Sequence, residues 1–294
     1  MISIVIVSFR STSILAKCLE ALSPEIGSGD EVIVVENSRD ERVAELREFA
    51  LDNFTLLIND RNVGYSKGCN QGIEMAVNDQ ILLLNPDTLP KAGALEALKN
   101  LLQTKEKNAL YAVELINPDG ARQDYYRRFP SVRALLVMFF IPRKYQSRFY
   151  AYRRYTYANE YLSRKSFEQP PGAGLVVPKT IQLDEDFFVY GSDLMLSWDF
   201  AQTSCQEVTL LPVKFLHMRG QGGTSSSPDL ADWLRVESAS GFALFYRKSG
   251  QYTRHVVWMM SFAILEFLGI IKYLFNPAQR TRRFRRLMTF IHMT

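Results

Sequence analysis

The chain has 294 residues, of which 47% are hydrophobic and 22% are charged, and its formal net charge is +4. A chain of this kind builds a substantial core, and it contains no internal repeat or low-complexity linker, so repeat and linker proteins are excluded. Its three scattered cysteines, Cys18, Cys69 and Cys205, show neither metal-ligand spacing nor a disulfide framework, which is typical of a reducing compartment.

Two apolar runs near the N-terminus each end in polar side chains. Residues 2–10 predict a first buried strand, and residues 31–38 repeat that design. The pattern between them predicts a helix, so the three elements form a βαβ unit in a parallel sheet. The apolar positions of that helix are Ile14, Leu15, Cys18, Leu19 and Leu22. Because the chain starts directly in a strand without a basic leader, we expect no secretory signal.

A glycine-rich segment follows at residues 62–72. Its glycines, Gly64, Gly68 and Gly72, allow the backbone to approach a ligand closely. A helix is predicted to begin near Asn70, and a helix start after such a loop is a common anion site.

The next apolar run, residues 81–84, ends abruptly at Asn85, Pro86 and Asp87. In open α/β sheets, ligands bind outside the carboxyl ends of such strands. A carboxylate there suits a hard divalent cation that also contacts phosphate oxygens. The alternative interpretation of this segment is ordinary turn and helix-capping chemistry.

These segments occur in order with residues 171–174, residues 183–190, Asp193 and His217. The ordered set resembles the family 2 glycosyltransferases, inverting nucleotide-sugar enzymes with the GT-A fold, and especially their rhamnosyltransferase-like branch. The resemblance covers roughly the first 220 residues and implies an α/β fold with a Rossmann-like, mostly parallel central sheet flanked by helices. It implies a catalytic domain, placed at 1–228, with a nucleotide-binding half at 1–100 and an acceptor-side half at 101–228. Beyond the resemblance, the apolar and basic pattern of residues 229–294 predicts a C-terminal helical, membrane-associating extension.

By the same resemblance, Ser8, Phe9, Arg10 and Glu36 form the nucleotide pocket. Glu36 stands where an aspartate is more usual, and its longer side chain moves the acceptor oxygens outward; the alternative is a solvated acid at a strand end. Lys67 is expected to neutralise phosphate, unless it is merely exposed to solvent. The loop expected to close over ribose and diphosphate comprises Asn62, Gly64, Lys67, Gly68 and Asn70.

A divalent metal, Mn²⁺ or Mg²⁺, is implied as cofactor. Asp87 resembles the second acid of the family's DXD-type motif, and Asn85 stands where some relatives carry another aspartate, so both are assigned to the nucleotide-sugar site. His217 matches the histidine that is a second metal ligand in relatives, and an imidazole nitrogen suits Mn²⁺ better than Mg²⁺. A purely structural histidine is the alternative.

Asp193 matches the aspartate of the family's Glu-Asp pair and is the predicted catalytic base. A helix N-cap at Ser192 or Asp193 is the structural alternative, and both readings are compatible. Ser192 and Met195 stand where relatives commonly carry acids. A noncatalytic nucleotide-sugar-binding or scaffold relative therefore remains the alternative function.

Arginines alternate with aromatic residues over positions 125–155. We favour a membrane-facing insertion, because aromatic rings prefer the lipid interface and arginines bind phosphates. Binding of single-stranded nucleic acid and an ordinary tyrosine-rich surface are the alternatives.

The C-terminal part contains a long apolar run, residues 256–271, which Glu266 and Lys272 interrupt. A central acid is costly in lipid, so we expect helices that lie in the interface or pack against a partner. A basic cluster follows, and such a helix can place its cations on phosphate head groups. An amphipathic helix packed on the catalytic domain or in a dimer is the alternative. The cluster consists of Arg280, Arg282, Arg283, Arg285 and Arg286.

Together these features predict a metal-dependent inverting glycosyltransferase. By the same resemblance, the donor is expected to be dTDP-rhamnose or a UDP-hexose, the acceptor a saccharide or a lipid-linked glycan, and the product a part of a bacterial surface polysaccharide. We expect a cytoplasmic, peripheral protein on the inner face of the cell membrane, with no nucleic-acid partner, and the sequence leaves a homo-oligomer open. A nucleotidyltransferase is disfavoured because the first strand lacks a glycine-rich, basic signature.

Overall fold

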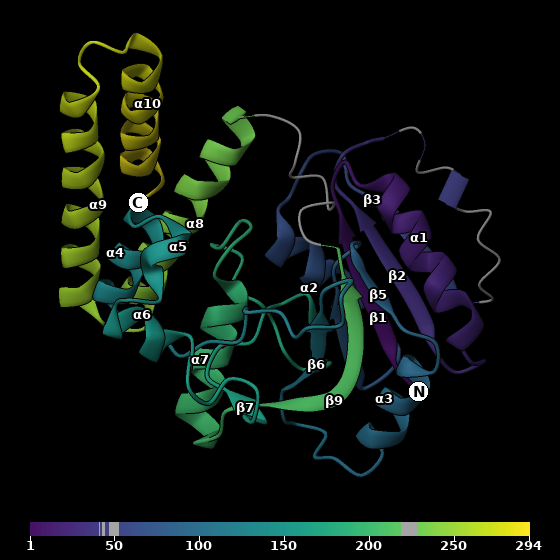
Figure 1. Ribbon diagram of the computed structural model, residues 1–294. Coiled ribbons are helices and arrows are strands. Elements are labelled where there is room, and N and C mark those ends of the chain that lie inside the picture. The colour runs from purple at the N-terminus through teal and green to yellow at the C-terminus, as the bar shows by residue number, and fades with distance from the viewer. Residues whose placement is uncertain (41, 43–44, 47–52, 219–227) are drawn as a thin grey trace.

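The computed structural model describes residues 1–40, 42, 45–46, 53–218 and 228–294. Within them, one sheet runs through the molecule in the order β3-β2-β1-β4-β8-β6-β9-β5, with β7 paired to β9 (Figure 1). The strands are β1 (Ser3–Ser8), β2 (Glu31–Glu36), β3 (Phe54–Ile58), β4 (Gln80–Leu84), β5 (Thr88–Pro90), β6 (Tyr111–Ile116), β7 (Ser166–Phe167), β8 (Gly174–Pro178) and β9 (Val208–His217).

Helices cover the sheet and extend beyond it. The helices are α1 (Thr12–Leu22), η1 (Ser23–Glu25), α2 (Tyr65–Met75), α3 (Ala94–Leu102), α4 (Val132–Phe140), α5 (Arg143–Gln146), α6 (Tyr150–Tyr155), α7 (Ser192–Ser204), α8 (Pro228–Lys248), α9 (Tyr252–Lys272) and α10 (Pro277–Met293). The predicted α/β fold class, with C-terminal helices, is confirmed.

The N-terminal half of the sheet is parallel, and its strands are buried because helices cover them. β1 lies between β2 and β4, so the strand order reverses at β1. Ser8 pairs with Glu36 and Ile6 pairs with Leu84, which brings the carboxyl ends of three strands to one edge. The predicted βαβ unit is therefore confirmed, and the sheet offers the crevice where ligands of such folds bind.

Helix α2 begins at Tyr65, five positions before the predicted start at Asn70. Gly64 supplies the turn before it with φ of +87°. A Cβ at Gly68 would lie 2.9 Å from Val7, so this glycine lets α2 pack closely on β1. The prediction of a loop reaching Asn70 was wrong because a glycine required for close helix packing looks, in sequence, like a glycine required for a loop.

The C-terminal helices share a second hydrophobic core with the sheet domain. Trp258, Phe262 and Phe290 are fully buried, and they belong to one cluster with Leu135 of α4 and Leu194 of α7. In Figure 1, α9 and α10 lie side by side as a hairpin next to α8. The extension therefore packs on the sheet domain, and the division at residues 228 and 229 stays a prediction.

Glu266 is fully buried and does not face outward from α9. Its carboxylate pairs with Arg283 at 3.1 Å, with Arg286 at 3.7 Å and with Arg235 of α8 at 4.0 Å. Arg282 pairs with Asp232 of α8 in the same inward direction. The expectation that this basic cluster binds lipid phosphates was therefore wrong for these arginines, because acids on α8 and α9 attract them inward.

Helix α9 is long and apolar enough to cross a membrane by length and composition, and it is the one such helix in the described ranges. Only 22% of its most apolar window is buried. Its inner face nevertheless packs on α8, α10 and α4.

The basic, aromatic segment at 125–155 is divided between the core and the surface. Six of its eight basic residues are exposed, namely Arg133, Arg143, Lys144, Arg148, Arg153 and Arg154. Tyr126 and Tyr155 are buried, and Phe139 packs edge to face on Trp258. Exposed aromatic rings of this segment lie on and beside α5 and α6, where Tyr150 is 79% exposed. The surface expected to face a membrane is therefore reduced to these short helices.

Candidate active site

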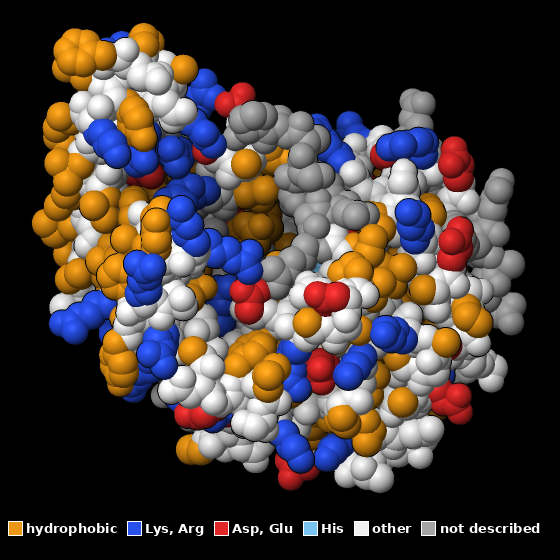
Figure 2. All heavy atoms as spheres, in the orientation of Figure 1, with side chains coloured by type: hydrophobic (Ala, Val, Ile, Leu, Met, Phe, Trp, Pro, Cys, Tyr) orange, Lys and Arg blue, Asp and Glu red, His pale blue; other side chains and the backbone are white. Residues whose placement is uncertain are grey.

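A cavity of about 530 Å³ opens between the switch-point edge of the sheet and α8. Figure 2 shows it as a hollow with apolar side chains at its floor. This volume lies in the usual range of small-molecule sites. The predicted site residues that line it are Phe9, Asn62, Gly64, Asn85, Asp87, Asp193 and His217.

Asp87 and His217 are neighbours because β5 pairs with β9, with Thr88 opposite His217. The Nε2 atom of His217 lies 3.4 Å from Oδ1 of Asp87, and both residues are buried. The topology of the sheet thus joins two residues that are 130 positions apart in the sequence.

Gln123 fixes the ring of His217. Its amide nitrogen donates to the carbonyl oxygen of His217 at 2.8 Å, so its amide oxygen faces Nδ1 of the same residue, also at 2.8 Å. An amide oxygen only accepts, so Nδ1 carries the proton, and in the neutral ring Nε2 presents its lone pair toward Asp87. Two acceptor atoms facing each other form an arrangement that a cation stabilises.

The pair fits a divalent cation, although it is not a complete metal centre. Two ligands at right angles on an ion about 2.1 Å away lie roughly 3 Å apart, close to the observed spacing. In the described part of the chain, no group of three Asp, Glu, His or Cys side chains could hold a metal. A cation held here would need further oxygen ligands from a bound molecule or water.

Asp193 lies in the first turn of α7, with Gly191 rather than Ser192 or Asp193 at the N-cap position. Its carboxylate accepts hydrogen bonds from the backbone nitrogens of Gly172, at 3.0 Å, and Leu194, at 2.8 Å. Burial raises the pKa of Asp193 above its ordinary value, and these hydrogen bonds oppose that rise. A carboxylate with a raised pKa is a stronger proton acceptor, which suits a general base.

Tyr190 lines the cavity, and three acidic residues are close enough to influence its phenol. Burial and the negative charges of Glu237, Asp193 and Asp87 raise the pKa of its phenol to about 12. Glu237 of α8 holds the segment before α7, since its carboxylate accepts from the backbone nitrogens of Val189, at 2.9 Å, and Tyr190, at 3.2 Å. Burial raises the pKa of Glu237 to about 7.

Glu36 lies outside the cavity lining and is fully buried. Its Oε1 accepts a hydrogen bond from the backbone nitrogen of Ser38 at 2.6 Å. Its Oε2 is buried without a hydrogen-bond partner among the described residues. Buried polar atoms are normally paired, but this oxygen is closed off from the cavity, so the assignment of Glu36 to the nucleotide stays a prediction.

The other predicted nucleotide-binding residues also lie outside the lining. The hydroxyl of Ser8 contacts Ser11 at 3.0 Å, Arg10 is exposed, and Lys67 pairs with Glu185 at 3.4 Å on the surface. The side chain of Asn70 bonds the backbone of residue 183, and Gly68 lies against β1. Their assigned roles stay predictions.

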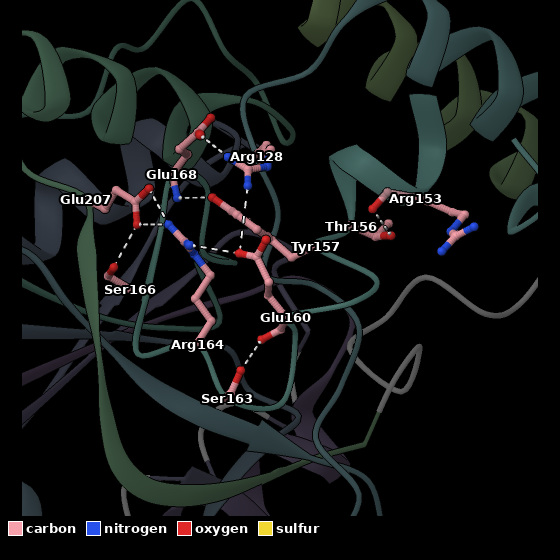
Figure 3. Close-up of polar contacts among 10 residues, drawn as sticks. All are labelled: Arg128, Arg153, Thr156, Tyr157, Glu160, Ser163, Arg164, Ser166, Glu168 and Glu207. Atoms are coloured by element: carbon pink, nitrogen blue, oxygen red, sulfur yellow. Dashed lines mark hydrogen bonds and ion pairs between the residues drawn. The ribbon is translucent and has the colours of Figure 1, made fainter. Parts of the chain in front are cut away.

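Arg127 and Gln169 line the cavity as a backbone pair, each nitrogen donating to the other's carbonyl oxygen at 2.8 Å. The residues next to them in the chain, Arg128 and Glu168, belong to an ion-pair network (Figure 3). In it Arg128 pairs with Glu168 at 3.3 Å, while Arg164 pairs with Glu207 at 2.5 Å. The sequence pattern did not point to the lining or supporting residues Gln123, Gln169 and Glu237, because their partners are distant along the chain. It placed Arg127 in the basic, aromatic segment expected to face a membrane, whereas the structure places it in the cavity lining.

The sequence profile of glycosyl transferase family 2 matches residues 3–169, more than half of the chain. The chain belongs to glycosyl transferase family 2. No curated protein matches it.

Solved structures share the fold at low sequence identity. S. aureus TarS 1-349 in complex with UDP is 12% identical over 83% of this chain and 64% of that one, with a TM-score of 0.51. Glucosyl-3-phosphoglycerate synthase from Mycobacterium tuberculosis, with Mn²⁺, UDP and phosphoglyceric acid, is 16% identical over 85% and 78%, with a TM-score of 0.52. The mannosyltransferase PcManGT from Pyrobaculum calidifontis, with GDP-Man and Mn²⁺, is 11% identical over 99% and 86%, with a TM-score of 0.55.

At these low sequence identities, the structural similarity shows the fold alone. It is the GT-A fold that the sequence predicted. This family 2 chain spans 39% of the longer TarS structure and 64% of the shorter one. The rhamnosyltransferase-like branch stays a prediction.

Proposed function

We propose that this family 2 protein transfers a sugar from a nucleoside diphosphate sugar to an acceptor hydroxyl, with inversion. One observation carries the proposal: Asp193 and the pair of Asp87 and His217 line the same cavity at the switch point of the sheet. Inversion needs a base on one face of the sugar and charge stabilisation for the leaving diphosphate on the other. This cavity offers both kinds of group.

Each side chain then has a defined task. Asp193 accepts the proton of the attacking hydroxyl, and its raised pKa supports that role. Such general-base help is worth about two to four orders of magnitude in rate. Phe9 lines the cavity as an apolar wall for the base, whereas Glu36 is buried outside the lining and its contact with the nucleotide stays a prediction.

Asp87 and His217 would hold Mn²⁺ or Mg²⁺, with the diphosphate and water completing the coordination. When bound, such an ion neutralises charge on the leaving diphosphate. Gln123 orients the imidazole for this contact.

The donor is proposed to be dTDP-rhamnose or a UDP-hexose, and the acceptor a saccharide or lipid-linked glycan of a bacterial surface polysaccharide. The binding of UDP by TarS and of UDP-glucose by the M. tuberculosis synthase supports this donor class. GDP-mannose in PcManGT extends the set of donors to be tested.

A donor panel tests the proposal. The panel consists of UDP-, dTDP- and GDP-sugars. In the presence of Mn²⁺, we expect the true donor to raise the melting temperature of the protein more than the other sugars do, since a ligand of the folded state stabilises it. We also expect release of nucleoside diphosphate when an acceptor is added. A flat melting response across the panel would overturn the donor assignment.

A noncatalytic relative is the second candidate, because Ser192 and Met195 replace acids beside Asp193. Donor binding without release of nucleoside diphosphate, across acceptors that include lipid-linked glycans, would favour that function.

We infer further that the protein lies on the inner face of the cell membrane through α9. Large apolar side chains cover the outer face of this helix, which forms the left edge of Figure 2. An exposed face of this size marks an interaction site. Residues 228–294 hold ten Lys or Arg and four Asp or Glu, a net charge of +6 that attracts anionic lipid. The exposed residues include Val256, Val257, Met260, Ile264, Phe267, Leu268, Ile271 and Phe275.

Co-sedimentation with anionic and with zwitterionic vesicles tests the membrane surface. We expect binding to anionic vesicles and its loss in the double variant Phe267→Asp, Leu268→Asp. Light scattering without vesicles distinguishes the alternative: a stable dimer that this double variant dissociates would assign the face to a second copy of the chain.

A further inference from the structure

Helix α8 contacts the cavity with one face and the helices α9 and α10 with the opposite face. One face lines the cavity with residues spaced by three or four positions, which places them in a single stripe along the helix. The stripe consists of Leu230, Trp233, Leu234, Ser238, Gly241 and Phe242. The opposite face packs on α9 and α10, where Trp258 donates a hydrogen bond to the carbonyl oxygen of Ala239 at 2.9 Å.

The α8 wall differs chemically from the rest of the cavity. Across from it, Asp87, His217, Asn62 and Asn85 supply polar atoms for phosphate and sugar. The stripe itself carries no charged side chain, and Met138 of α4 adds a further apolar surface to the lining. A binding pocket fixes the orientation of its ligand with a few polar groups and makes most of its contact area with apolar groups. The cavity therefore has a polar end and an apolar end.

Asp193 and Ser192 line the cavity. The segment just before them lies against α8, since a Cβ at Gly241 would clash with the carbonyl oxygen of Tyr190. The Ser192 side chain is buried, and its hydroxyl has no hydrogen-bond partner among the described residues. A buried hydroxyl of this kind is normally paired, so it is available to a polar group of a bound molecule. A molecule held here would place its hydroxyl beside Ser192 and Asp193 and its apolar part along α8.

We infer that the α8 wall binds the hydrocarbon chain of the acceptor, so that the acceptor is a lipid-linked molecule rather than a free saccharide. This inference rests on the proposed function for the role of Asp193. The leucine, methionine and phenylalanine side chains of this wall offer a saccharide no hydrogen bonds, whereas they cover a hydrocarbon chain without leaving polar groups unpaired. Trp233 and Ser238 are the two members of the stripe with a polar side-chain atom. The position of α8, with α9 and its exposed apolar face directly behind it, agrees with an acceptor that comes from a lipid surface.

Binding of two matched glycosides tests the inference. The probes are decyl β-D-glucoside, kept below its micelle concentration, and methyl β-D-glucoside, which carries the same sugar without the chain. Binding is measured by calorimetry. We expect the decyl compound to bind at least tenfold more tightly, because its chain removes apolar surface from water. Equal affinity of the two glycosides would overturn the inference.

Substitutions in the stripe test whether the decyl chain of the glycoside binds there. Leu234→Asp is expected to lower the affinity for the decyl glucoside at least tenfold, and Ser238→Phe, which fills the cavity, is expected to do the same if Leu234→Asp does not fold. Leu162→Asp is the matched control, since Leu162 is 77% exposed and lies away from the cavity. If Leu268→Asp on α9 abolishes binding while Leu234→Asp and Ser238→Phe leave it intact, the chain binds the outer surface and the inference fails.

The donor panel separates this inference from the proposed function. Selective binding of the decyl glucoside without any response to nucleotide sugars would retain the apolar subsite and reject the transferase. Donor binding with equal affinity for both glycosides would retain the transferase and reject the apolar subsite.

Discussion

The sheet domain and the C-terminal helices treat buried charge in opposite ways. At the cavity, the hydroxyl of Ser192 is buried without a hydrogen-bond partner among the described residues, and Asp193 lines the open space. In the helices, buried Glu266 is surrounded by three arginines, although its Oε1 accepts no hydrogen bond within the described part of the chain. A carboxylate that lines a cavity is open to a ligand, whereas one whose charge is balanced by arginines of neighbouring helices serves their assembly.

Net charge separates the same two regions. Residues 228–294 carry +6, and the whole chain carries +4, so residues 1–227 carry −2. Much of the positive charge of the helices is nevertheless paired with Asp229, Asp232 and Glu266. The basic composition of this region therefore serves the packing of α8, α9 and α10 as well as any attraction to lipid.

The largest expected effect tests the cavity side of this comparison. Asp193→Asn removes the proton acceptor but keeps the shape of the side chain. We expect release of nucleoside diphosphate to fall by about 10²- to 10⁴-fold, with donor affinity unchanged. Asp199→Asn, an exposed acid on the same helix, is the matched control. Equal rates for Asp193→Asn and wild type would remove Asp193 from the mechanism.

The next effect tests the helical side. Glu266→Gln leaves three arginines without their common partner, and breaking a buried pair costs about 3–5 kcal/mol. We expect the free energy of unfolding in urea to fall by that order. Asp229→Asn, which breaks an exposed pair with Arg285, should cost less than about 1 kcal/mol. Equal losses in the two variants would contradict the distinction between buried and exposed pairs.

A smaller effect concerns the orientation of the metal-ligand candidate. Gln123→Leu removes the acceptor for Nδ1 of His217 together with the donor to the carbonyl oxygen of the same residue, while the backbone pairing of β5 with β9 does not involve this side chain. Loss of such a supporting partner typically weakens metal binding by about 10- to 100-fold. Titration of Mn²⁺ in the presence of UDP, followed by electron paramagnetic resonance, measures it. An unchanged affinity would show that His217 does not depend on Gln123.

The last effect is a pH dependence at the junction of the two regions, which is gradual along the pH scale. Burial raises the pKa of Glu237 from 4.5 to about 7, so the folded protein binds an extra proton between these values. Stability contributed by this group is therefore present at low pH and falls as pH rises from about 4.5 to 7, by at most about 1.4 kcal/mol per pH unit. Glu237→Gln should flatten this part of the curve of melting temperature against pH. A slope identical to that of wild type would contradict the assignment.

The sequence by itself determined the local elements that carry the cavity. The apolar pattern of α1 and the run that ends before Asp87 were read correctly, because helices and buried strands impose a short-range period on the chain. The ordered motifs predicted the GT-A fold, and the structure brings Asp87, Asp193 and His217 to one cavity as that fold requires.

Only the tertiary structure decided where buried side chains find their partners. The start of α2, the inward direction of Glu266, the support of His217 by Gln123 and the apolar stripe of α8 all depend on contacts between distant segments. A glycine can serve a loop or close helix packing, and an arginine can bind a ligand or pair with an acid. The sequence alone does not tell which neighbour each of them contacts. Those neighbours are set by strand pairing and helix packing, which no local pattern encodes.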